Sequence, residues 1–232
     1  SERKLGDIAQ PRQGVKTLDN DYFMRMWFEV SIGKICFTTE SFDDAIRKKV
    51  KWLPYTKGGD FRKWYGNNEY VVNWENDGYE MKQYAISQYN SVTRTITNLS
   101  FWFREGLTWS MISSGSFSLR YVKIGFGFDA RGSMMFMDSD VLFYIFGFLC
   151  TKIACTYLDI ISPTISFEVG NISKLPIIFS ESNKPKVEAL VNKNIALSII
   201  DWDIFESSWD FKRHPLAAYS YHAIEREVPA IG

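Results

Sequence analysis

The amino-acid sequence predicts a mixed α/β (α+β) fold, in which a twisted β-sheet packs around a long central helix and a helical segment ends the chain. Short β-rich runs between clusters of glycine, asparagine and serine predict the strands. One long apolar run predicts a buried helix, and apolar residues at helical spacing near the end predict another. The 232 residues are enough for one domain with a sizeable core and a tail.

The strands are predicted at 70–74, 118–122 and 125–129, where β-branched and aromatic residues dominate. Two shorter helices are predicted from their first residues, because serine and aspartate favour helix starts. The first covers 42–50 after Ser41, and the second covers 79–88 after Asp77.

The long helix is predicted at 139–160. It is apolar nearly all round, so we expect it at the centre of the domain.

A polar segment, SESNKPK at 180–186, is the clearest composition shift in the chain. We place a domain boundary there, with one domain at 1–180 and a C-terminal helical and aromatic extension at 181–232. In the extension, 186–200 has helical periodicity and the aromatic stretch DWDIFESSWDF follows it. We expect this extension to pack back on the domain.

Charge is balanced overall but unevenly placed. The chain has 27 Lys and Arg against 27 Asp and Glu, yet 47–63 holds seven cations against Asp60 alone. This distribution predicts one basic face and an acidic tail.

Three cysteines without a CxxC pair, and no secretory leader, favour a reducing cytoplasm. The apolar run 141–150 is too short to span a bilayer, so no membrane partner is expected.

The sequence offers no pattern typical of a catalytic, cofactor or metal site. GFGFDA at 125–130 fits GxGxxA, but a strand pattern continues where the dinucleotide motif needs a helix. His214 and His222 have no ligand spacing around them, and Cys150 and Cys155 are expected to be small buried apolar residues. We therefore expect no metal and no cofactor in this chain.

The segment 51–78 combines cations and aromatic rings around a Gly-Gly turn. Glycines let the backbone approach a partner closely, and Lys and Arg can meet phosphates. The alternative is that the tryptophans are core residues and the lysines form a solvated rim. We expect this for Trp52 and Trp74, and both interpretations remain open for Trp64. The candidate DNA-binding residues in this segment are Lys57, Gly58, Gly59, Arg62, Lys63, Trp64, Tyr65 and Asn67.

A second stretch, LTWSMISSGSFSLRY at 107–121, is rich in serine around Gly115. Its hydroxyls and arginine suit hydrogen bonds to phosphates and base edges, although a plain serine-rich hairpin is an alternative. Alternation from Phe117 predicts Leu119 on the core face and an outward-facing arginine after it. The candidate DNA-binding residues here are Thr108, Ser113, Ser114, Ser116 and Arg120.

These two stretches resemble the C-terminal target recognition region of PglX-type adenine-specific DNA methyltransferases from BREX phage-defence systems, and type IIL restriction-modification enzymes share the pattern. The resemblance covers nearly the whole chain. It includes KLGDIAQPRQG and DNDYFMRMWFEV near the start, and SPTISFEVGNISKLPI and DWDIFESSWDF near the end.

The resemblance implies a non-catalytic module that reads a DNA site, so that the methyltransferase core of the parent chain adds an N6-adenine methyl group there. The core would bind S-adenosylmethionine, because this chain lacks the Gly-rich loop and the Pro-Pro-aromatic turn of DNA amino-methyltransferases. Double-stranded DNA and that core are the expected partners, with other BREX proteins and phage DNA-mimic inhibitors as further ones.

In this interpretation Lys57 and Lys63 meet phosphates, and Arg62 or Arg120 reads a base, since arginine binds guanine in a bidentate manner. A strand-surface ion pair with Asp129 is the alternative for Arg120. The alternative function is a protein-interaction platform within the defence complex, with the aromatic stretch 201–211 as its surface. A carbohydrate-binding module is disfavoured, because it would not need the cation cluster.

Overall fold

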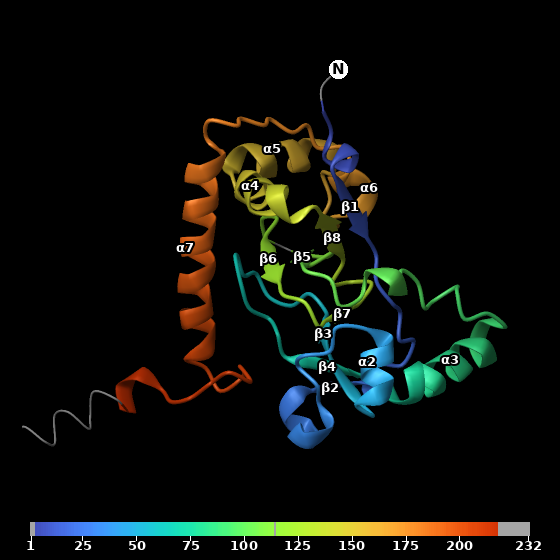
Figure 1. The fold of residues 1–232 in the computed structure, drawn as a ribbon. Helices are drawn as coiled ribbons and strands as arrows, with labels where there is room; N and C mark the ends of the chain where they lie inside the picture. Colours follow the sequence, from blue (N-terminus) through green and yellow to red (C-terminus); the bar gives the residue numbers. More distant parts are fainter. Residues whose placement is uncertain (1–2, 114, 218–232) are drawn as a thin grey trace, which may run out of the picture.

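The computed structural model describes residues 3–113 and 115–217, and in these residues the strands form two four-stranded sheets with helices packed around them. The mixed α+β class is therefore confirmed, although the strands divide into two sheets. Figure 1 shows α4, α5 and α6 near one sheet, α2 and α3 near the other, and α7 along one side of both.

The first sheet has the strand order β1-β8-β5-β6, and each neighbouring pair is antiparallel. Its edge strand β1 lies near the start of the chain, where Ala9 pairs with Met137 of β8. Its strands are β1 (Ala9–Arg12), β8 (Met134–Met137), β5 (Gly106–Trp109) and β6 (Leu119–Val122).

The second sheet has the order β2-β4-β3-β7 and is mixed, because β3 pairs with β7 in parallel and with β4 antiparallel. The strands of this second sheet are β2 (Met24–Met26), β4 (Tyr70–Asn73), β3 (Trp52–Thr56) and β7 (Gly127–Phe128). The strand predicted at 70–74 corresponds to β4, and the strand predicted at 125–129 is reduced to the two residues of β7.

Two hydrophobic clusters form the core. One includes Trp109, Phe146 and Leu158, and the other includes Trp74 and Phe128 of the second sheet's side together with Phe136 of β8, so it joins the two sheets. The core positions expected for Trp52 and Trp74 are confirmed, since they are 8% and 1% exposed. Helices that contribute to these clusters are α2 (Phe42–Arg47), α3 (Glu75–Tyr89), α4 (Ser139–Leu149), α5 (Lys152–Ile161), α6 (Val169–Ile172) and α7 (Lys184–Asp203); α1 (Asn20–Phe23) adds Phe23.

The helix predicted at 42–50 starts as expected, whereas α3 begins at Glu75 and not after Asp77, whose carboxylate accepts from the Trp74 indole N–H and does not cap the helix. The Ser41 hydroxyl accepts a hydrogen bond from the backbone N–H of Asp44, which caps α2. In α3 the regular turns follow Gly78, whose positive φ of 68° keeps the backbone clear of the Trp74 ring; a Cβ there would lie 3.0 Å from it.

The single long helix predicted at 139–160 is wrong, because α4 and α5 are separate helices bent by 78°. Thr151 is extended between them, and its hydroxyl accepts from the backbone N–H of Ala154, which starts a new helix. In the part of the chain that the structure describes, no single helix is long and apolar enough to cross a membrane. Only this bent pair reaches that length and composition.

Candidate nucleic-acid interface

The structure brings the two stretches singled out in the sequence side by side. The segment after β3 crosses from the second sheet to β6, where the Trp64 N–H donates to Leu119 O at 2.8 Å and the Tyr121 N–H to Trp64 O at 2.9 Å. In Figure 1 this segment runs between α7 and β6. The Ser110 hydroxyl donates to Gly59 O at 2.8 Å, which joins the loop after β5 to the glycine turn.

The Lys57–Gly59 turn has a conformation that requires glycine. Gly58 and Gly59 have φ of 97° and 105°, values that L side chains rarely adopt. The Asn67 amide donates to Gly58 O at 3.2 Å and to Asp60 O at 2.9 Å. Asn67, a predicted DNA-binding residue, therefore holds the turn in place.

A groove of about 350 Å³ opens beside this turn. The Lys57 ammonium lies 5.1 Å from the centre of the Tyr70 ring, and the exposed Arg131 also lines the groove. A buried carboxylate, Asp129, accepts from the Arg131 N–H at 2.7 Å, and burial raises its pKa. Because none of the described residues that line the groove is a carboxylate, its wall is suited to an anion. The lining residues are Lys57, Gly58, Gly59, Tyr70, Ser110, Ile112 and Arg131.

Sequence reasoning missed Arg131. The turn that carries it packs backbone against backbone on the glycine turn: a Cβ on Gly132 would lie 2.7 Å from the carbonyl carbon of Lys57. This contact joins Lys57 and Gly132, which are 75 residues apart in the sequence. The one local signal for it was that Arg131, like Lys57, is followed directly by a glycine.

The predicted residues after the turn do not line this groove. Arg62 donates to Asp201 at 2.8 Å and stacks 4.9 Å from the Trp202 ring centre, so α7 holds it. Trp64 is half-buried with its ring 4.9 Å from Phe146. Tyr65 is buried, and burial raises its pKa to about 12.

Lys63 also lies away from the groove. It lies close enough to Cys150 and Cys155 for its positive charge to favour lower pKa values of their thiols. Burial outweighs that cation and raises the pKa of Cys150 to about 12. Both cysteines pack against the first hydrophobic cluster but are only partly buried, so the expectation of small buried apolar residues is met in part.

The outward orientation predicted for Arg120 is wrong. Its side chain is 1% exposed, because β6 is covered on both faces, and it makes no ion pair with Asp129. Thr108 is likewise buried at 2% exposed, and its hydroxyl donates to the carbonyls of Gly132 and Ser133. Of the predicted serines, Ser113 is half-buried and Ser116 exposed, whereas Ser114 lies outside the described residues.

The aromatic stretch 201–211 packs largely onto the rest of the chain. Trp202 is 5% exposed, and Trp209 stacks against Phe37 with ring centres 4.9 Å apart. The Trp27 indole N–H donates to Ser207 O at 2.8 Å. These contacts anchor the stretch, while Phe205 stays 47% exposed. The interaction platform and the domain boundary at 180 both stay predictions.

The segment 125–130 does not form a nucleotide loop. Gly127 belongs to β7, where a Cβ would lie 2.7 Å from the Trp102 ring, and Phe128 is fully buried. No helix follows it before β8, so the segment does not fit the pattern that binds a dinucleotide or S-adenosylmethionine.

The contact of Arg62 with α7 leads to a testable prediction. We expect Arg62→Ala to lower the free energy of unfolding by about 1–2 kcal/mol, since it removes a partly exposed ion pair and a cation–π contact. Urea unfolding of Arg62→Ala, Asp201→Asn and the double variant measures the coupling, expected at about 0.5–1 kcal/mol. Additive effects of the two single changes would show that the ion pair does not hold α7.

Comparison with known proteins gives the following. No protein-family profile matches the chain. It is 39% identical over 212 residues, 91% of its length, to the adenine-specific methyltransferase PglX of Lacticaseibacillus casei (strain Zhang). It is 36% identical over 222 residues, 90% of its length, to the adenine-specific methyltransferase BrxX of Escherichia coli O9:H4 (strain HS). The aligned region spans 17% of the length of each of these relatives. The resemblance predicted from the motifs is thus confirmed: over about nine-tenths of its length the chain matches a segment of the PglX- and BrxX-type adenine-specific methyltransferases.

Proposed function

We propose that the chain recognises a specific sequence in duplex DNA and directs N6-adenine methylation by a longer PglX-like methyltransferase in BREX phage defence. The observation that carries this proposal is the groove at the glycine turn, which has two cations and no carboxylate along its wall. The printed names of the relatives, adenine-specific methyltransferases, support DNA as the ligand.

Within this proposal, Lys57 and Arg131 contact phosphates on either side of the groove. Base contacts come from the loop after β5, which the glycine turn borders and where Ser113 and Ser116 are at least partly accessible. Phosphate contacts orient such a module, whereas hydroxyls on base edges give sequence information. Arg62 is not assigned to a base, because Asp201 and Trp202 already hold it.

We propose further that this chain is not itself catalytic, and that the methyltransferase core of the longer protein binds S-adenosylmethionine and the flipped adenine. Its place of action would be the bacterial cytoplasm. Phage proteins that mimic DNA, and therefore carry carboxylates in place of phosphates, would compete for the same groove.

The proposal is tested by the salt dependence of binding to duplex DNA, measured by fluorescence anisotropy. We expect weak binding by the chain alone, and a logarithm of the binding constant that falls linearly with the logarithm of salt concentration, by about 0.9 per phosphate contact. A salt-independent affinity, or no binding by either the chain or a longer methyltransferase that contains it, would contradict the proposal.

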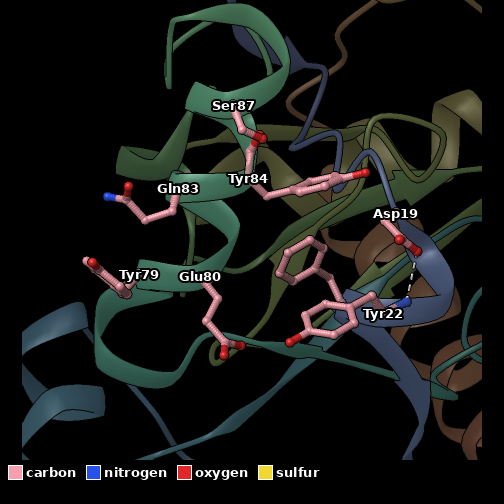
Figure 2. Close-up of a pocket in the computed structure, with 8 residues that line it drawn as sticks. Asp19, Tyr22, Tyr79, Glu80, Gln83, Tyr84 and Ser87 are labelled. Atoms are coloured by element: carbon pink, nitrogen blue, oxygen red, sulfur yellow. Dashed lines mark hydrogen bonds between the residues drawn. The ribbon is translucent and has the colours of Figure 1, made fainter.

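A second candidate function, contact with another protein, is favoured by a different cavity. Figure 2 shows this cavity of about 480 Å³ between α1 and α3, lined by the rings of Tyr22, Tyr79 and Tyr84 and by Glu80. Tyr22 and Tyr79 are 55% and 60% exposed, and tyrosines are enriched in protein interfaces. None of the predicted DNA-binding residues lines it, so the two functions can be separated by mutation.

A further inference from the structure

Arg120 is a buried cation that the described residues leave almost unpaired. Its side chain is 1% exposed, and its Nη2 donates only to Gly58 O, at a long distance of 3.4 Å. Its Nε and Nη1 have no hydrogen-bond partner. A buried charge without a partner is costly, so such a group is uncommon unless something outside the described residues pairs with it.

The surroundings of Arg120 do not neutralise its charge. Thr108, opposite it on β5, directs its hydroxyl to other backbone carbonyls. Arg62, which has a like charge, lies close enough to act on it and is itself paired with Asp201. Burial and this neighbouring charge lower the pKa of Arg120 to about 10, so the guanidinium is still charged at neutral pH.

A single glycine peptide lies between this guanidinium and the groove. Gly58 lines the groove, while its carbonyl oxygen accepts from Arg120 on the inner side. The same oxygen also accepts from Asn67, and Ser110 donates to the next carbonyl, so three side chains hold the turn in its present position. The two hydrogen bonds to Gly58 O are long, at 3.4 and 3.2 Å, and glycines can adopt backbone conformations closed to other residues, so the turn can move once these contacts are replaced by contacts with a ligand.

We propose that the Lys57–Gly59 turn covers a phosphate-binding arginine, and that Arg120 pairs with a phosphodiester of the bound DNA when the turn shifts. The inference rests on the function proposed above. A shift of the turn would release Nη2 from Gly58 O, and Nε and Nη2 together form the side edge of the guanidinium that can bind two oxygens of one phosphate. Lys57 and Arg131 would contact neighbouring phosphates from the groove side, since both line it.

The test replaces Arg120 by methionine, which fills similar space without a charge. We expect the midpoint of thermal unfolding to rise by roughly 2–8 °C, because an unpaired buried charge is removed. The affinity for duplex DNA is expected to fall at least tenfold, and the salt slope by about one unit. A lower unfolding midpoint with unchanged DNA affinity would show a purely structural role and would overturn the inference.

A second measurement does not depend on the folding of a variant. The Nε–H signal of Arg120 in a 15N spectrum of the unaltered chain is expected to shift when duplex DNA is added, and to shift much less with inorganic phosphate. A signal that moves only with inorganic phosphate, or not at all while DNA binds, overturns the inference. If the unaltered chain and a longer protein that contains it bind no DNA, the proposed function itself fails, and the two failures are thereby distinguished.

Discussion

Replacing Lys57 and Arg131 together by methionine is expected to weaken binding to duplex DNA by roughly one to two orders of magnitude at 0.1 M salt. The reason is that both cations face one carboxylate-free groove, and each phosphate contact contributes about 0.9 to the salt slope. The slope should therefore fall by about two units, and by the same amount for cognate and unrelated duplexes. Anisotropy titrations at several salt concentrations measure both quantities.

The matched control removes two cations elsewhere. Lys186 and Lys193 are exposed on α7 and take part in no ion pair among the residues described. The double change Lys186→Met and Lys193→Met alters the net charge equally and should leave the affinity within about twofold. Equal losses in the two double variants would show that total charge, and not the groove, governs binding.

Gly14→Ala is expected to cause the largest loss of stability among single methyl additions to this chain. A Cβ at Gly14 would lie 2.0 Å from the carbonyl oxygen of Phe128, which accepts from the Val15 N–H at 2.9 Å. Because that oxygen belongs to the backbone of β7, neither side can move freely. We expect a loss of about 3 kcal/mol or more, seen as a fall of roughly 6–12 °C in the unfolding midpoint.

Gly170→Ala is the control for this prediction. Gly170 lies in α6, and no atom is found within 4 Å of the position that its Cβ would take. Alanine is favoured over glycine in helices by about 0.5–1 kcal/mol, so this variant should be as stable as the unaltered chain or slightly more stable. A similar loss in both variants would mean that the contact at Gly14 is not the cause.

Local signals in the sequence were enough to predict where most elements begin. Ser41 caps α2, and the apolar periodicity of 186–200 lies within α7. The break at Thr151 was missed because the apolar pattern continues across it. A threonine that caps a helix also cannot be told from any other threonine in the sequence. The division into two sheets depends on strand pairings between distant residues, which local patterns do not contain.

The candidate site was predicted in part. Its glycine turn and Lys57 were found from composition, because Gly-Gly beside cations is a local feature. Arg120 was misplaced because alternation assumes one open face of a strand, whereas consecutive residues of β6 are buried on both faces. The partner of Arg62, Asp201, lies 139 positions away, and no local rule predicts such a contact.

The pairing of β1 with β8 also affects how the chain is made on the ribosome. Ala9 of β1 pairs with Met137, so β1 leaves the ribosome long before its partner strand exists. At about 5–20 residues per second, translation needs roughly 6–26 s to cover that interval. During this time β1, an edge strand of the finished sheet, has no partner to pair with. Nascent chains therefore complete the first sheet only after Met137, about three-fifths of the way along this sequence, has emerged.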